Sequence, residues 1–577
     1  MTRLLNDSKD FPRQLVQGFV ESNPNFVKPV FGGVVRASVS TPGKVVVISG
    51  GGTGHYPAFT GWVGPGLLDG GVTGNIFSSP SASQAVSVAK AANKGGGVLI
   101  AFLNYAGDVL HFGQAAERLR ADDIDARIAV VTDDVASAPA TERHLRRGIA
   151  GGLAVLKITS AAAEAGLNLD EVIDVFNAAN ESVLTFGVAL SGCTLPGAGH
   201  ALFEVPPGKI AVGAGVHGEP GIYETDLGTA HDVAGLLVDR LLQERPAGAG
   251  NRVVAILNGL GSAKYEELFV TFISVGSLLR DAGIEVVEGE VGEFMTSLDM
   301  GGVSLTLVWL TEKIEKYYFA ECDTAAYKRR APLAPLLPAD LVFNTEAEPI
   351  TVNAPGSEAS RRSAQVIATG LERIAAVIEA NAEKLGDLDA IAGDGDHGVG
   401  MTRGSAAAAV AARYLADNGG GAQTALVGAG DRWSENAGGA SGALWGAALT
   451  AAGNALGDTD YVDVAAQAKA LRALVASIQT LGRASLGDKT MVDAQLPFVE
   501  AFEAAVAAGA GTALAWSTAA DAADVAAQAT AALTPLIGRA RVLSQRSVGY
   551  PDPGAVSFAL IAKTVAELVA TDHSIRQ

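Results

Sequence analysis

Two histidines in this sequence stand between glycines, an arrangement that presents an imidazole on a tight turn. His217 lies in the run 213–221, GAGVHGEPG, and His55 ends the run 49–55, SGGGTGH. The glycines remove side-chain bulk and allow sharp turns, and Pro220 disfavours a helix running on from the His217 loop. Each histidine is a candidate nucleophile or proton carrier. The alternative is a tight turn with an incidental histidine, and two such loops in one region favour the functional interpretation.

Neither glycine loop fits a standard nucleotide-binding pattern. The run 50–55 follows an apolar, β-branched run, but it lacks the Lys-Ser/Thr of a P-loop, and His55 stands where a third glycine belongs. The run 213–218 has the spacing of a dinucleotide-binding loop, yet Glu219-Pro220-Gly221 follows where a helix should open. Binding of a dinucleotide is therefore disfavoured.

A carboxylate follows a third apolar run of the same region. Asp108 ends the run 104–108, NYAGD, directly after a predicted strand. Ligand sites of open α/β sheets lie at the carboxyl ends of strands, where Asp108 could accept a proton from a substrate hydroxyl. The alternative role of such a residue is to cap the following helix.

Three further carboxylates lie close together in the second half of the chain. Asp389, Asp394 and Asp396 fall within the run 388–398, LDAIAGDGDHG. An all-oxygen set of this density suits Mg²⁺ or Ca²⁺ rather than Zn²⁺, and the spacing is not that of an EF-hand. The alternative is an acidic solvated loop. Combined with the two imidazole loops, the cluster indicates phosphoryl transfer onto a small carbonyl compound.

The elements that must position these residues change type along the chain. Short apolar runs alternate with helical segments up to about residue 335, which predicts an α/β region with parallel or mixed sheets and flanking helices. Its strands are expected at 45–49, 98–102, 128–132, 209–212, 253–257, 284–287 and 303–310. A break near 191–199 suggests lobes of about 1–190 and 191–335. A proline-rich linker at 336–356 and an alanine-rich, all-α bundle or barrel at 357–577 follow.

Composition excludes several classes of function. The 577 residues carry a net charge of −20, which argues against nucleic acid as a partner. Cys193 and Cys322 make no disulfide framework and suggest reduced, buried thiols in a cytoplasmic protein. The N-terminal residues lack the apolar core of a signal peptide, and no uninterrupted apolar run predicts a membrane span.

Taken together, the runs GGGTGH, NYAGD and VHGEPG resemble the dihydroxyacetone kinase family over essentially the whole chain. The resemblance implies that His217 adds to the ketone carbon and holds the substrate as a covalent hemiaminal, that His55 hydrogen-bonds the substrate and that Asp108 is the base. The expected ketose-binding residues are Gly52, Thr53, Gly54, His55, Asp108 and His217. A hemiaminal would fix a small ketose in one orientation and reject glycerol, which has no carbonyl to attack.

The same resemblance assigns ATP to the helical half. It implies that Asp389, Asp394 and Asp396 bind two Mg²⁺ ions that hold the ATP phosphates. The run 438–442, GGASG, could offer free backbone N–H groups to phosphate where it opens a helix, although it could also be a flexible turn. The expected ATP-binding residues are His397, Gly398, Val399, Gly400, Ala440, Ser441, Gly482, Thr490, Met491, Asp552, Pro553 and Gly554. A homodimer with exchanged nucleotide domains is also implied.

Four positions depart from the family pattern. Tyr56 replaces the usual Glu, Leu103 the usual Lys, Ala106 the usual Thr and His111 the usual Asn. Loss of two charged groups near the ketose favours a larger substrate such as erythrulose, the D form placed ahead of the L form. Dihydroxyacetone is the alternative substrate. The rival functions are a phosphorelay subunit that keeps bound ADP and a ketose-sensing protein, and cyclase activity on FAD is a minor side possibility.

Overall fold

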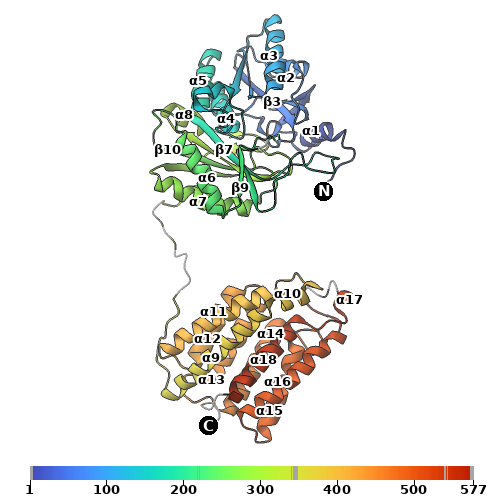
Figure 1. Ribbon diagram of the computed structural model, residues 1–577, viewed down its shortest axis with the longest axis vertical. Helices are drawn as coiled ribbons and strands as arrows, with labels where there is room; N and C mark the ends of the chain where they lie inside the picture. Colours follow the sequence, from blue (N-terminus) through green and yellow to red (C-terminus); the bar gives the residue numbers. More distant parts are fainter. Residues whose placement is uncertain are drawn as a thin grey trace. The chain divides into compact units, whose positions relative to one another are not determined.

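The computed structural model describes residues 4–217, 219, 221–338, 341, 343, 349–538, 541 and 544–571 (Figure 1). The chain forms two compact units, residues 1–339 and 340–577. Residues 218 and 220 of the His217 loop, and 339, 340, 342 and 344–348 of the expected linker, lie outside the described residues.

The first unit contains two six-stranded sheets with helices on their faces. The first sheet has the order β1-β2-β4-β3-β5-β6, in which β3, β4, β5 and β6 run parallel. Its strands are β1 (Val27–Val30), β2 (Gly33–Arg36), β3 (Val46–Thr53), β4 (Gly70–Ile76), β5 (Val98–Leu103) and β6 (Ala126–Val131). The buried, β-branched β3 and β5 lie in the middle of the sheet, as their composition predicts.

The second sheet is mixed, with the order β11-β10-β12-β7-β8-β9, and only β10 and β11 pair in parallel. Its strands are β7 (Val183–Ser191), β8 (Lys209–Val212), β9 (Tyr223–Asp226), β10 (Arg252–Gly259), β11 (Glu285–Gly292) and β12 (Gly301–Trp309). Because β7 pairs with β12, this sheet begins at Val183, earlier than the expected break near residue 191.

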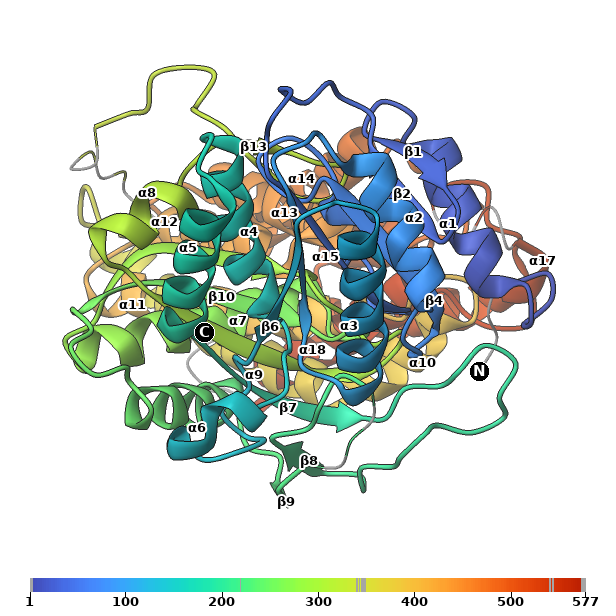
Figure 2. The ribbon, with the colours of Figure 1, turned by 90° about the horizontal axis from the view of Figure 1, so that it is seen from above.

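Three layers of helices separate and cover the two sheets. Helices α2 (Ala82–Ala92) and α3 (Ala106–Ala121) cover the outer face of the first sheet, and α6 (Ala230–Gln243) and α7 (Tyr265–Asp281) that of the second. Between the sheets lie α4 (Gly152–Glu164) and α5 (Leu169–Ser182), whose apolar side chains share one core with both sheets. Figures 1 and 2 show α2 beside α3 and α4 beside α5.

Shorter elements complete the first unit. They are α1 (Phe11–Ser22), η1 (Thr60–Trp62), η2 (Ala140–Leu145), α8 (Glu312–Tyr318), β13 (Cys322–Asp323) and β14 (Lys328–Arg329). Cys193 and Cys322 are both buried and neither is in a disulfide.

The second unit is all helical, which confirms the predicted fold class. Its helices are α9 (Glu358–Ala380), α10 (Ala382–Ala390), α11 (His397–Asp417), α12 (Ala422–Ala437), α13 (Gly439–Leu456), α14 (Val464–Gly482), α15 (Val492–Ala507), α16 (Thr512–Ala529), η3 (Thr530–Ala532), α17 (Ser544–Ser547) and α18 (Pro553–Thr571). They run alongside one another around a common core in which alanines alternate with larger apolar residues (Figure 1). Small side chains let neighbouring helices approach closely, which explains the alanine-rich composition.

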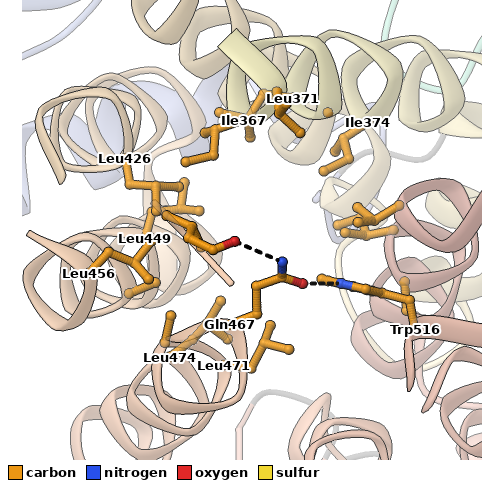
Figure 3. A pocket seen from close by; sticks show the side chains of 18 of the residues that line it. Ile367, Leu371, Ile374, Leu426, Leu449, Leu456, Gln467, Leu471, Leu474 and Trp516 are labelled. Carbon is orange, nitrogen blue, oxygen red and sulfur yellow. Dashed lines mark hydrogen bonds between the residues drawn. The ribbon is translucent and has the colours of Figure 1, made fainter. Parts of the chain in front are cut away.

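An apolar cavity of about 230 Å³ lies inside this helical unit. Figure 3 shows leucines and isoleucines from several helices around it, with Gln467 as a polar group whose side chain hydrogen-bonds Trp516 and the Val462 carbonyl. Trp433 and Trp445 stack on each other in its wall, 5.1 Å apart, and both are buried. The two tryptophans therefore belong to the core rather than to an adenine site.

Among the described residues, one helix is long and apolar enough to cross a membrane by length and composition alone. That helix is α18, and just over half of its apolar window is buried inside the unit. Its packing against α9, α15 and α16 is typical of a core helix.

Candidate active site

The structure brings the three expected catalytic residues of the first unit into one cluster. The rings of His55 and His217 lie 4.7 Å apart, centroid to centroid, and stand nearly perpendicular. Asp108 is close enough to interact electrostatically with His217. Two aromatic rings complete the surroundings of His217: Tyr105 at 4.5 Å and Phe77 at 5.5 Å, both edge-on.

His55 is buried directly after β3 and is held in one tautomer. Its Nδ1 lies 2.7 Å from the carbonyl oxygen of Thr296, so Nδ1 carries the proton and donates it. Burial, followed by the neighbouring His217, lowers the pKa of His55 to about 3. The imidazole is therefore neutral near pH 7, with the lone pair of Nε2 available as a hydrogen-bond acceptor.

His217 is oriented by Glu219 of its own loop. One carboxylate oxygen of Glu219 accepts the backbone N–H of His217 at 2.8 Å, and the other lies 3.4 Å from His217 Nδ1. Burial opposes ionisation of Glu219, but hydrogen bonding and charge interaction with His217 outweigh it and lower the pKa to about 2. Because an ionised carboxylate only accepts, the proton of a neutral His217 belongs on Nδ1, which leaves Nε2 as a nucleophile.

Asp108 lies in the first turn of α3 and is 6% exposed. Burial raises its pKa to about 6, and a hydrogen bond with Ser79 and the nearby His217 limit the rise. The carboxylate is thus mostly ionised at neutral pH while remaining a stronger base than an exposed aspartate, as a proton acceptor requires.

Four buried polar atoms around this cluster have no hydrogen-bond partner among the described residues. They are Thr53 Oγ1, His55 Nε2, Tyr105 Oη and Asp108 Oδ1. Buried polar groups are almost always paired, so an unpaired set at strand ends points to a ligand that carries several hydroxyls. Three of these four residues were expected from the sequence, whereas Tyr105 was not.

One segment of the second sheet holds both histidine loops. Residues 294–300 connect β11 to β12; Thr296 accepts from His55, Leu298 N–H donates to the Gly54 carbonyl at 3.0 Å, and Ser297 Oγ donates to the Val216 carbonyl. Nothing in the composition of this segment marks it as functional, because it acts through its backbone and two small hydroxyls. Sequence reasoning therefore missed it.

The glycines of the first loop are required by close approach. A Cβ on Gly52 would lie 2.5 Å from the backbone nitrogen of Ser78, and Gly54 has a φ of +103°. The ring of Phe77 stacks on that of His55, with 4.8 Å between the centroids. This contact is possible because both glycines lack a side chain and so leave room for the segment that carries Phe77.

The two positions expected to alter the ketose surroundings lie in apolar contacts. Leu103 ends β5, is buried and packs against Gly152 at the start of α4. Tyr56 is about half exposed, and its ring leans edge-on against Phe19 of α1. Neither side chain supplies a charge where the family pattern has one.

In the helical unit the three expected metal ligands also come together. Asp389, Asp394 and Asp396 each offer a carboxylate oxygen, and these oxygens lie within 4.8 Å of one another. Asp389 accepts the N–H of Gly395, whose φ of +79° makes the turn that folds the run back on itself. A compact all-oxygen set fits a hard divalent cation such as Mg²⁺.

A cavity of about 560 Å³ adjoins these carboxylates. Ten of the expected ATP-binding residues line it: His397, Gly400, Ala440, Ser441, Gly482, Thr490, Met491, Asp552, Pro553 and Gly554. The first residues of α13, Gly439, Ala440 and Ser441, line the same cavity, and the N-terminus of a helix suits a phosphate.

Two expected residues do not line this cavity. Gly398 packs against the Ala382 carbonyl, where a Cβ would lie 1.9 Å away, and Val399 is half exposed. On α11, His397 and Gly400 are three residues apart and share the cavity face, whereas the intervening positions face elsewhere. The cavity is also lined by Pro535, Ile537 and Tyr550, which carry no motif and were not predicted.

Two side chains that line this cavity have shifted pKa values. Burial raises the pKa of Asp552 to about 7, opposed by the Ala555 N–H that its carboxylate accepts at 2.8 Å. Burial likewise lowers the pKa of His397, whose Nε2 lies 3.0 Å from Ser557 Oγ. A neutral His397 beside three aspartates adds no cationic charge to the cavity.

Comparison with known proteins agrees with this two-part arrangement. Residues 17–326 match the Dak1 domain and residues 391–567 match the DAK2 domain. The chain is 49% identical to a D-erythrulose kinase of Mycolicibacterium smegmatis, over 99% of both chains. It is also 49% identical to an L-erythrulose kinase of Pectobacterium atrosepticum, over 99% of this chain and 97% of that one.

A solved structure extends the likeness to the fold. The dihydroxyacetone kinase of C. freundii in complex with AMP-PNP and Mg²⁺ is 30% identical, with a TM-score of 0.62 over 98% of this chain and 99% of that chain. The expected fold class and the expected enzyme class, a phosphotransferase with an alcohol acceptor, are both confirmed. The chain belongs to the dihydroxyacetone kinase family, with both domains of that family in one polypeptide.

Proposed function

We propose that this chain is an ATP-dependent kinase that phosphorylates a terminal hydroxyl of a short ketose held covalently on His217. The observation that carries the proposal is the tautomer imposed on His217 by Glu219, which leaves Nε2 as a nucleophile among unpaired buried polar atoms. An imidazole held in this way suits addition to a carbonyl carbon.

Each residue of the cluster then has one role. His217 Nε2 adds to the ketone carbon, the carbonyl π electrons pass to oxygen, and that oxygen takes a proton from water to become a hydroxyl. Glu219 offsets the positive charge on the imidazole. His55 Nε2 accepts a hydrogen bond from a substrate hydroxyl, and Asp108 removes the proton of the terminal hydroxyl as its oxygen attacks the γ-phosphorus, the bond from that phosphorus to the bridging oxygen breaks and ADP leaves.

ATP is the proposed phosphoryl donor, bound in the cavity of the helical unit. Asp389, Asp394 and Asp396 would hold Mg²⁺, two ions in this proposal, and the start of α13 would bind phosphate oxygens through its N–H groups. Bound Mg²⁺ neutralises phosphate charge and stabilises the transferring phosphoryl group. The complex of the C. freundii kinase with AMP-PNP and Mg²⁺ supports this assignment.

The proposed division of labour follows the two units. Residues 1–335 bind the ketose, 336–356 link the halves and 357–577 bind ATP. A homodimer in which one subunit's nucleotide domain caps the other's ketose site would bring the two substrates together, and the proline-rich linker suits such an exchange. Two buried cysteines that form no disulfide accord with a cytoplasmic location.

Erythrulose is the proposed ketose. Leu103 is apolar and Tyr56 packs against Phe19, so neither position offers a charged partner to a small triose. The erythrulose kinases among the relatives support the assignment. The D form is placed ahead of the L form, although the relatives named for each are equally identical to this chain.

The preference can be measured directly. We expect D- or L-erythrulose to exceed dihydroxyacetone in kcat/KM, and the double variant Leu103→Lys with Tyr56→Glu to shift preference toward dihydroxyacetone. Loss of hydrogen-bonding partners changes discrimination on the order of 10²-fold. Steady-state assays that give kcat/KM for all three ketoses test this preference. If the wild type prefers dihydroxyacetone about tenfold or more in kcat/KM, the erythrulose assignment is wrong, while the kinase assignment is unaffected.

His217→Ala should abolish the covalent adduct and lower ketose turnover by orders of magnitude, because the nucleophile is removed. A crystal soaked with ketose should show continuous density from Nε2 of the wild-type imidazole to the ketone carbon. The exposed His231 provides the control, since His231→Ala should keep both adduct and activity. A clearly non-bonded ketose in wild-type crystals would contradict the covalent mechanism.

Asp394→Ala or Asp396→Ala should remove Mg²⁺-dependent nucleotide binding while the first unit stays folded, because the ligands belong to the other unit. Isothermal titration with Mg-ATP measures this affinity. Asp387→Ala removes an exposed carboxylate of α10, the helix that carries Asp389, and should bind Mg-ATP as the wild type does. Unchanged affinity in both cluster variants would rule out the metal assignment.

A further inference from the structure

The His217 loop is rich in glycine, so the position of Glu219 needs support from outside the loop. Arg147 is the cation beside it. A Cβ built on Gly215 would lie 2.4 Å from Glu219 Oε2 and 2.7 Å from Arg147 Nη1, so both groups converge on the bare face of that glycine. Burial opposes the charged form of Arg147, but charge interactions with Asp134, then Tyr105 and then Glu219 outweigh it and raise the pKa.

Arg147 is itself fixed by the end of the first sheet. Its Nε donates to Oδ2 of Asp134 at 2.9 Å, Nη2 lies 2.8 Å from the same oxygen as an ion pair, and the Asp134 side chain is 1% exposed. The backbone adds two bonds: Arg147 N–H donates to Ser137 Oγ, and Asp134 N–H donates to the Arg147 carbonyl. A guanidinium bound on this edge has a fixed direction for its remaining N–H groups.

The same guanidinium also reaches the start of the catalytic loop. Its Nη2 lies 3.3 Å from the carbonyl oxygen of Gly213, directly after β8. Asp134 follows β6 of the first sheet and forms a β-bridge with Thr185 of β7 in the second sheet, and Gly213 follows β8. Arg147 therefore joins the loop that carries His217 to the segment after β6, at the start of the loop through Gly213 and near Glu219 through charge.

We propose that Arg147, braced by Asp134, is a positioning residue that holds Glu219 where it keeps the proton on Nδ1 of His217. The inference rests on the proposed function, since a fixed tautomer matters only if Nε2 is the nucleophile. Arg147 itself need not touch the substrate. Gly215 is required for this arrangement, because any side chain at this position would separate the Arg147 guanidinium from the Glu219 carboxylate.

The experiment compares Arg147→Met, Arg147→Lys and Gly215→Ala in the full-length protein. Arg147→Met should lower kcat/KM for the ketose about 100-fold, with KM for Mg-ATP unchanged, because misplacing a reacting group costs on this order. Arg147→Lys keeps the charge without the fork and should lose about tenfold. Gly215→Ala keeps every charge and should resemble Arg147→Met.

A spectroscopic readout separates positioning from general loosening of the fold. In ¹⁵N-histidine-labelled protein, the His217 ring, assigned from its absence in His217→Asn, should show Nδ1 protonated and Nε2 bare. In Arg147→Met and Gly215→Ala it should shift toward the other tautomer. Arg240→Met removes another partly buried arginine, which binds the adjacent Val135 carbonyl and Glu244, and should keep the wild-type tautomer.

The outcomes are distinct. A wild-type tautomer and kcat/KM in Arg147→Met, or in Gly215→Ala if the former does not fold, would overturn the inference while His217→Ala still reports on the proposed function. An equal tautomer change in Arg240→Met would also overturn it, since the effect would then be general. Activity retained in His217→Ala would instead refute the proposed function itself.

Discussion

The hydrogen bond from His55 Nδ1 to the Thr296 carbonyl is the interaction on which the candidate site depends, because it joins the two sheets beside His217. The loop after β3 carries His55, and the loop after β8 carries His217, yet residues 294–300 hold both. Neither sheet alone carries both His55 and His217. The five-layer packing, with α4 and α5 shared between the sheets, fixes the distance that this short segment has to bridge.

The two histidines differ in burial, and this difference favours a different role for each. His55 is neutral because its surroundings are dry, and it can only accept through Nε2. His217 is partly exposed and lies beside Glu219, whose carboxylate favours the tautomer with the proton on Nδ1 and leaves Nε2 available for a ligand. Burial raises the pKa of Asp108 to about 6, so its carboxylate is a stronger proton acceptor than that of an exposed aspartate. These roles come from environment, since two of the three residues are of one chemical type.

The sequence predicted what glycine, β-branched and acidic runs can encode. The strands β3, β5 and β6 were predicted correctly, and the three aspartates lie close together as expected, while the roles of the histidine loops, Asp108 and the aspartates stay predictions. It could not predict Phe77, Tyr105 or Thr296, because they act through ring edges and a backbone carbonyl. The sequence also could not predict that β7 belongs to the second sheet. Which sheet a strand joins depends on distant partners such as β12 and not on the residues of the strand alone. On α11, Val399 does not line the cavity, because consecutive residues of a helix do not share one face.

Covalent capture of a carbonyl, followed by phosphoryl transfer from ATP within this one chain, is the central claim. Its most direct test is ADP release by the purified protein with Mg-ATP and either erythrulose or erythritol and threitol, the alcohols obtained by reducing its ketone. We expect steady release with erythrulose, no other protein being needed, and essentially none with either alcohol. Equal turnover of the alcohols would contradict capture through the carbonyl, and no ADP release with any short ketose would contradict the kinase mechanism.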